Sequence, residues 1–301
     1  MRALMALLAA AAVLVPAGCG AADDPAPPTS ALPSQGSGTV EIGGRKLTVH
    51  VPESYDPAKP APLVLALHGY SSNAAEVETY FRLVPESERR GFVYAYPDGS
   101  TDDRGDQFWN ATDACCAFGP QPDDSRYLSE LISTIQASYR IDPARVSLIG
   151  HSNGGFMAFR MACDHADQIS AIVSLNGATW NDPARCKPSK PVSVLAVHSE
   201  TDETIALGGG DIDGDAYPSA AGTVSQWLRL NRCASTGRAA PNLDLDRNMP
   251  AAETSVRVYE QGCAGGSTVQ AWTIKGGSHV PQLGPDFTPA VTGFLLAAVK
   301  R

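Results

Sequence analysis

The chain has 301 residues, of which 43% are hydrophobic, and it carries a formal net charge of −9 at pH 7. No basic cluster interrupts this acidic balance, which argues against a nucleic acid partner because phosphate binding needs concentrated lysine and arginine. The length fits one large α/β domain preceded by a leader and a tether.

Residues 1–18 have the pattern of an export signal: Arg2 supplies a short positive region, an apolar stretch follows, and small residues precede Cys19. The apolar stretch is short for a bilayer and no stop-transfer segment follows it, so we expect no membrane span. The cysteine is typical of a bacterial lipoprotein cleavage site, and we expect Cys19 to be lipidated and to hold the protein at the cell envelope. Simple secretion is the alternative, since Pro16 stands where such signals usually carry an aliphatic residue.

Residues 19–38 are rich in alanine, proline, serine and glycine and hold almost no bulky apolar side chain. Such a segment cannot bury enough surface to offset its ordering entropy, so we expect a tether. The folded domain is then predicted to span residues 39–301, and we expect it to be monomeric.

Apolar runs predict strands throughout this domain, beginning with a hairpin over residues 39–51. The later predicted strands cover residues 62–68, 92–97, 145–152, 169–177, 192–198 and 268–277. Helical patterns lie between them, at residues 73–90, 125–140, 154–167, 223–231 and 289–301. Most later strands are continuously apolar, as expected for strands covered on both faces. The order predicts an α/β fold with a doubly wound, mostly parallel sheet and helices on both faces.

Ligands bind at the carboxyl ends of the strands in such sheets. One of these ends carries Gly150-His151-Ser152-Asn153-Gly154, which has the G-x-S-x-G pattern between a strand and a helix. A sharp turn there would hold a serine in strained geometry, and bulky neighbours would clash with it. We therefore predict that Ser152 is a nucleophile. His151 precedes it on the strand and should point to the other side, as a neighbour without a role.

A serine hydroxyl needs a base to take its proton, and histidine titrates near neutral pH. Three histidines follow the serine. His165 should lie at the opposite sheet edge, and His198 comes before the predicted acid, so His279 is the predicted base.

A carboxylate must orient this imidazole and stabilise its charged form. Asp202, four residues past a strand end, is the predicted acid, with Glu200 as the main rival and Glu203 as a second. The backbone N–H groups of Asn153 and Tyr70, the latter in the loop after an earlier strand, are predicted to stabilise the oxyanion.

Three other motifs favour structural interpretations. The aspartates of residues 211–215 have calcium-loop spacing but lack the required glycine and glutamate, so a flexible loop beside the substrate is preferred. Residues 110–112 form a glycosylation sequon to which we assign no role. Asp123 and Asp124 precede a predicted helix and fit a helix cap.

Seven cysteines are present, and lipidation of Cys19 leaves six, which fits three disulfides in an exported protein. No CxxC pair or histidine–cysteine cluster indicates zinc. Topology pairs Cys163 with Cys186 at the sheet edge away from the site, and Cys233 with Cys263 before the segment of the predicted base. Elimination leaves the adjacent cysteines at 115 and 116, which either pair with each other or each reach a distant cysteine.

The stretches "SLIGHSNGGFMAFRMAC", "WNATDACC" and "GGSHVP" resemble those of poly(3-hydroxybutyrate) depolymerase-type esterases. This family sits beside the feruloyl and acetyl-xylan esterases of carbohydrate esterase family one, and the resemblance covers the chain from about Thr39. It implies an α/β-hydrolase fold, ester hydrolysis through an acyl-enzyme and no cofactor. It also places the triad on Ser152, Asp202 and His279.

The sequence departs from this family near the histidine, where relatives often carry a tryptophan and this chain reads Ser278-His279-Val280-Pro281. We expect Trp109 and Trp180, together with Tyr70, to supply the stacking surface for substrate instead. The predicted substrate is a feruloyl or acetyl polysaccharide ester or a hydroxyalkanoate oligomer. The alternatives are an acyltransferase on the same scaffold and a non-catalytic envelope binding protein.

Overall fold

The computed structural model of the chain describes residues 31–116 and 118–301. The predicted export signal, Cys19 and most of the predicted tether lie outside these residues. Within the described part, no helix is long and apolar enough to cross a membrane. Residues 36–38, which we assigned to the tether, already pair in the first strand.

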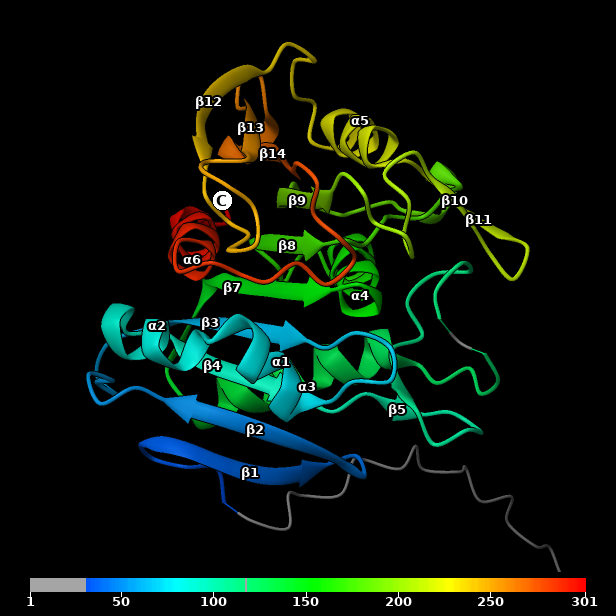
Figure 1. Cartoon of the computed structure of the whole chain (residues 1–301). Helices are drawn as coiled ribbons and strands as arrows, with labels where there is room; N and C mark the ends of the chain where they lie inside the picture. The colour runs from blue at the N-terminus through cyan, green and yellow to red at the C-terminus, as the bar shows by residue number, and fades with distance from the viewer. Residues whose placement is uncertain (1–30, 117) are drawn as a thin grey trace, which may run out of the picture.

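One ten-stranded sheet runs through the domain in the order β1-β2-β4-β3-β7-β8-β9-β14-β13-β12 (Figure 1). Its strands are β1 (Gly36–Ile42), β2 (Arg45–Val51), β3 (Ala61–Leu67), β4 (Val93–Pro97), β7 (Ile141–His151), β8 (Ala171–Leu175), β9 (Ser193–Ser199), β12 (Arg238–Leu243), β13 (Thr254–Tyr259) and β14 (Val269–Ile274). The central strands from β4 to β14 are parallel, and antiparallel strands extend the sheet at both edges. The predicted mostly parallel sheet is confirmed.

Helices cover both faces of this sheet, as the continuous apolar strands predicted (Figure 1). They are α1 (Ala74–Phe81), α2 (Leu83–Arg90), α3 (Asp124–Ser138), α4 (Asn153–Asp164), α5 (Ala220–Leu230) and α6 (Phe287–Ala297). Helices α3, α4 and α5 pack on one face, and α1, α2 and α6 pack on the other. Alternate residues of β3 enter the two cores: Leu65 lies on the α4 face and Val64 on the α1 face.

Several predicted elements differ in detail. The predicted helix over residues 73–90 is two helices, because Arg82 between them has a left-handed backbone with φ of 53°. Strands β12 and β13 were not predicted: the first is mostly exposed and contains a proline, and the second buries only alternate residues.

The predicted flexible loop around residues 211–215 is instead a short hairpin of β10 (Gly210–Ile212) and β11 (Asp215–Tyr217). Its turn residues, Asp213 and Gly214, both have positive φ, which is typical of a two-residue hairpin turn. A second small sheet pairs β5 (Ser100–Thr101) with β6 (Gln107–Phe108). Asp123 caps α3 by accepting a hydrogen bond from the N–H of Arg126, as predicted.

Three disulfides join the predicted pairs. Cys163 pairs with Cys186 across 23 residues, and Cys233 pairs with Cys263 across 30 residues. Cys115 pairs with its neighbour Cys116, and the peptide bond between them is cis. The alternative, in which each of these two reaches a distant cysteine, is therefore wrong.

Helix α4 lies close to β7 and β3 at the G-x-S-x-G motif. A Cβ atom added to Gly150 would overlap the carbonyl group of Gly154, and one added to Gly154 would overlap the carbonyl group of Leu67. Both clashes are with backbone, which cannot rotate away. The two glycines of the motif are therefore required for the close approach of helix and sheet.

We predict that Gly150→Ala lowers the free energy of unfolding by at least about 2 kcal/mol, because the added methyl group forces α4 away from the sheet. Gly293→Ala is the matched control. It lies inside α6 with open space around an added Cβ, so it should raise stability by about 0.5–1 kcal/mol through helix propensity. Urea unfolding of both variants makes the comparison, and equal effects would contradict the packing account.

Candidate active site

Ser152 stands between the end of β7 and the start of α4 with φ of 53° and ψ of −122°. A non-glycine residue in such a conformation costs on the order of 1–3 kcal/mol and needs support from its surroundings. Its N–H donates to the carbonyl of Leu175 at 2.8 Å, and its carbonyl accepts from the N–H of Phe156 at 3.0 Å. The strained turn predicted from the sequence is thus held by the next strand and by the helix.

Ser152, His279 and Asp202 form one hydrogen-bonded line at the carboxyl edge of the parallel strands. The Oγ of Ser152 is 2.9 Å from Nε2 of His279, and Nδ1 of the same ring is 2.9 Å from both carboxylate oxygens of Asp202. A carboxylate accepts only, so Nδ1 carries the proton and Nε2 is free to accept one from the serine. All three residues are nearly buried, with exposed fractions of 9%, 9% and 6%.

The carboxylate of Asp202 is held ionised although its side chain has no exposed surface. Burial alone would raise its pKa, but the hydrogen bond and charge of His279 and the N–H groups of Ile205 and Thr204 outweigh burial and hold the pKa below its ordinary value. The predicted rivals bind backbone instead: Glu200 accepts from the N–H of Gly276, and Glu203 accepts from the N–H of His279 itself.

The other two histidines considered from the sequence have structural positions. His165 follows the last residue of α4, at the far end from Ser152, where its ring is 3.1 Å from the hydroxyl of Ser125. His198 is buried, and its Nε2 donates to the carbonyl of Ile205 at 2.7 Å.

Tyr70 lies in the loop after β3 and is fixed at both ends. Its hydroxyl donates to Asp102 at 2.6 Å and its ring packs edge-on against Phe118. Burial, and then the hydrogen bond to Asp102, raise its pKa to about 12. Below it, the buried ring of His68 accepts from the N–H of Gly99 and so must donate from Nδ1 to the carbonyl of the next residue, which fixes the start of this loop.

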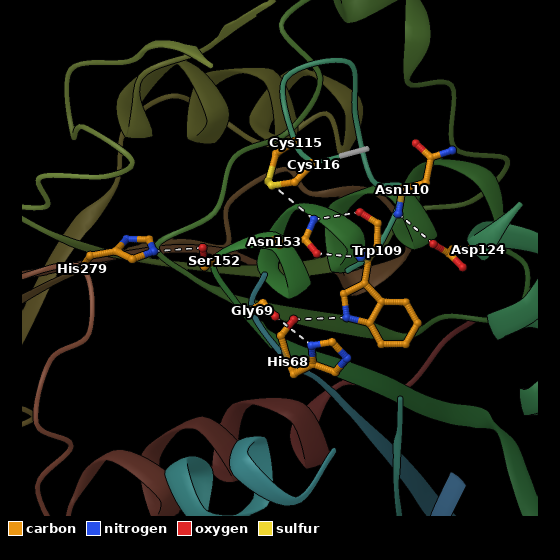
Figure 2. The surroundings of a disulfide bond; sticks show 10 residues. All are labelled: His68, Gly69, Trp109, Asn110, Cys115, Cys116, Asp124, Ser152, Asn153 and His279. Atoms are coloured by element: carbon orange, nitrogen blue, oxygen red, sulfur yellow. Dashed lines mark hydrogen bonds between the residues drawn. A yellow bond between two sulfur atoms is a disulfide. The ribbon is translucent and has the colours of Figure 1, made fainter. Parts of the chain in front are cut away.

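The turn at Ser152 between β7 and α4 is called the elbow below. The side chain of Asn153 holds the loop that carries the paired cysteines against this elbow, as Figure 2 shows. Its oxygen accepts from the N–H of Trp109 at 2.7 Å, and its nitrogen donates to the carbonyl of the same residue at 2.8 Å and to Sγ of Cys115 at 3.5 Å. The residue whose N–H we predicted to face the oxyanion is therefore held through both ends of its amide.

Neither predicted tryptophan offers a stacking face. Trp109 has no exposed surface, because its ring packs beneath the elbow and its Nε1–H donates to the carbonyl of His68 (Figure 2). Trp180 is 5% exposed, and the guanidinium group of Arg185 covers its ring at 4.2 Å from the ring centre. The sequence pattern placed both correctly near strand ends but carried no signal of this burial.

A pocket of about 310 Å³ opens onto Ser152 and His279. Its remaining lining residues are Gly69, Tyr70, Ser72, Glu76, Val77, Tyr80, His151 and Val280. Among the described residues, no group of three or more histidine, cysteine, aspartate or glutamate side chains is placed to hold a metal ion.

The chain is similar to known esterases in sequence. The model of a family described as "Putative esterase" matches residues 42–242. The chain belongs to this esterase family. It is a carboxylic ester hydrolase with the α/β-hydrolase fold.

Two curated relatives and one solved structure show how similar this esterase is to known proteins in sequence and in structure. A protein named "Putative esterase NocK", from Nocardia uniformis, is 25% identical, and the alignment covers 95% of this chain and 92% of that protein. Feruloyl esterase D of Neurospora crassa is 26% identical, with 92% and 87% covered. The structure of an acetyl xylan esterase from Aspergillus awamori superimposes with a TM-score of 0.62 at 14% identity, covering 83% of this chain and 93% of the other.

His151 of the esterase is more than the neighbour we expected. Its Nε2–H donates to the carbonyl of His279 at 2.8 Å, and the amide of Asn176 donates to the same carbonyl at 2.8 Å. His151 does point toward the α1 face, where its ring meets that of Tyr80, but the segment that carries His279 crosses the same face. The alternation of side chains along the strand predicted the direction in which His151 points. It could not predict that the later segment carrying His279 would contact it there.

The imidazole of His151 is held neutral. Burial and the adjacent ring of His279 lower its pKa to about 4, and burial also lowers the pKa values of His68 and His198. An unfolded histidine titrates near 6.5. As pH falls from about 6.5 toward 4, the unfolded chain takes up protons that the folded esterase does not, so stability is lost in that window.

We predict that His151→Asn, which keeps a donor for the carbonyl of His279, loses less stability than the wild type between pH 7 and pH 4.5. The difference should be about 2–3 kcal/mol, the share of one histidine whose pKa is lowered to this extent. Urea unfolding at the two pH values measures it. Parallel losses in the two proteins would contradict a neutral, buried His151.

Proposed function

We propose that this esterase cleaves its substrate through an acyl-enzyme on Ser152. The observation that carries the proposal is the unbroken hydrogen-bonded line from the Asp202 carboxylate through His279 to the Ser152 hydroxyl. His279 takes the serine proton as Oγ attacks the ester carbonyl carbon, and a tetrahedral oxyanion forms. The same proton then passes to the departing alcohol as the carbon–oxygen bond of the ester breaks.

The second half of the reaction uses the same groups. His279 takes a proton from water, and the resulting nucleophile attacks the acyl carbonyl. His279 then gives this proton to Oγ as the bond between the acyl carbon and Oγ breaks, which releases the acid and restores the serine hydroxyl. Asp202 stabilises the imidazolium that forms in each half, which an ionised carboxylate with a lowered pKa can do. The N–H groups of Asn153 and Tyr70 would bind the oxyanion in both halves.

The proposed substrate is a feruloyl or acetyl ester of a polysaccharide, with a hydroxyalkanoate oligomer as the alternative. The name of the Neurospora crassa relative supports the first. The resemblance of the serine elbow and of the paired cysteines to depolymerase-type esterases supports the second. The pocket volume of about 310 Å³ suits an acyl group of modest size in either case.

We further propose that the protein works outside the cytoplasm, held to the envelope by a lipid on Cys19. Three disulfides support an oxidising compartment, where such bonds persist. The small residues before the cysteine in the leader support the anchor.

We predict that Ser152→Ala lowers kcat by more than about 10³-fold on every ester that the wild type hydrolyses, because no other group replaces the attacking oxygen. The measurement is one panel of short acyl, feruloyl, acetylated xylan and hydroxybutyrate esters, run on both proteins. An unchanged melting temperature of the variant shows that it is folded. Hydrolysis that persists in folded Ser152→Ala would overturn the mechanism, and the preferred ester would identify the substrate class.

A further inference from the structure

The pocket at Ser152 is bordered by a further hollow in the surface. A second hollow of about 670 Å³ adjoins it and shares three lining residues with it: Glu76, Tyr80 and Val280. This hollow runs over α1, α2 and the start of α6, between the α1–α2 junction and the segment that follows His279. These three residues therefore separate the hollow at Ser152 from the second one, and a substrate longer than one acyl group can pass over them from the first hollow into the second. We call the two hollows together the groove.

The rim between the two hollows has an exposed apolar part at Val280. Val280, next to His279, is 49% exposed, and among the described residues only Val299 is another large apolar side chain exposed to this extent. Tyr80 forms the wall beside it, held by a hydrogen bond of 3.0 Å from its hydroxyl to the carbonyl of Pro281. Covering Val280 with a ligand removes apolar surface from water, which favours binding at this point.

The far part of the groove is rich in arginine, although the chain as a whole carries a net charge of −9. Arg82, Arg89 and Arg247 line it, together with the acid Glu86. Glu86 is buried and already paired with Arg89 and with Arg90 beside the groove. Glu76 lies at the junction of the two hollows and accepts a hydrogen bond from Ser72. The two remaining arginines, Arg82 and Arg247, have no ion pair with any acid among the described residues.

Arg82 occupies a backbone position that favours other residues. It has φ of 53° between α1 and α2, where glycine or asparagine would fit at lower cost. Its side chain is exposed, and in the described part of the chain no hydrogen bond or ion pair of its guanidinium group occurs. The left-handed backbone at this position does not explain why the residue is an arginine, and the guanidinium group has no ion pair among the described residues.

Arg247 is fixed in place from the other side of the groove. Its Nε and Nη2 donate to the carbonyl of Leu283 at 3.1 and 2.6 Å, and its backbone N–H donates to the carbonyl of Gln282. A carbonyl oxygen does not neutralise the guanidinium charge, so the cation is oriented but not paired. Oriented arginines of this kind suit a carboxylate, which accepts charge-assisted hydrogen bonds.

We propose that this groove binds the remote part of an oligomeric ester and selects a carboxylate on it through Arg82 and Arg247, with Val280 covering the chain in between. The proposal rests on the function proposed above, because the groove can bind the remote part of an ester only if Ser152, at its inner end, attacks the carbonyl of that ester. A carboxylate of this kind could come from a uronate on a polysaccharide or from the free end of a hydroxyalkanoate oligomer.

The test uses two matched pairs of esters with the full chain. One pair is an acetylated xylo-oligosaccharide with and without a uronate substituent, and the other is a hydroxybutyrate oligomer with a free terminal carboxylate or with its amide. We expect the wild type to prefer the carboxylate member of one pair by about tenfold in kcat/KM, the worth of one charge-assisted hydrogen bond. The pair that shows the preference identifies the source, and high salt should weaken it.

Arg82→Asn and Arg247→Gln should each reduce this preference toward one. Asparagine suits the left-handed backbone at position 82, so that variant keeps its fold and separates charge from stability. Arg126→Gln, an exposed arginine on α3 away from the groove, is the matched control and should keep the preference. A preference near one in the wild type for both pairs, or one that survives in both groove variants, overturns the proposal while leaving hydrolysis by Ser152 intact. If the wild type hydrolysed none of these esters in a way that depends on Ser152, that result would instead overturn the proposed function.

Discussion

The hydrogen bond between Ser152 and His279 joins residues 127 positions apart in the chain, and the other features of the site depend on what brings them together. Parallel strands end at a common edge, so the segments after β7, β9 and β14 meet there. The sheet order places β8 between β7 and β9, and the glycines at 150 and 154 allow α4 to approach β7 and β3 closely directly after Ser152. The placement of the three residues is thus a consequence of strand order and of two glycines that make room for the helix.

A second constraint is that the site must keep one buried side chain charged and a neighbouring buried side chain neutral. Asp202 is ionised in a place without exposed surface, and it stays so because backbone N–H groups and His279 surround it. Beside the ring of His279, burial keeps His151 neutral, and in that form it donates to the backbone carbonyl of His279. His279 is therefore held at its ring by a carboxylate and at its backbone carbonyl by two neutral donors, His151 and Asn176.

Patterns of the sequence that reflect local physics were reliable. Continuous apolar runs such as that of β3 predicted strands buried on both faces, and the glycine–serine motif predicted the turn at Ser152. Predictions of side-chain exposure were not reliable, because exposure depends on which distant segment of the chain packs over the residue. Trp109 looked like an exposed aromatic near a strand end, but the elbow packs over it. Strand β13 buries only alternate residues and β12 is mostly exposed, so neither has the continuous apolar signal of the central strands.

The central claim is that Asp202, and no neighbouring acid, holds the histidine that activates Ser152. The most direct test compares kcat of Asp202→Asn and Glu200→Gln on one ester that the wild type hydrolyses. We expect Asp202→Asn to lower kcat by roughly 10³- to 10⁴-fold, because an amide no longer stabilises the imidazolium or fixes its tautomer. Glu200→Gln should stay close to the wild type, since Glu200 only accepts from the backbone of Gly276. A large loss in Glu200→Gln with little change in Asp202→Asn would contradict the account.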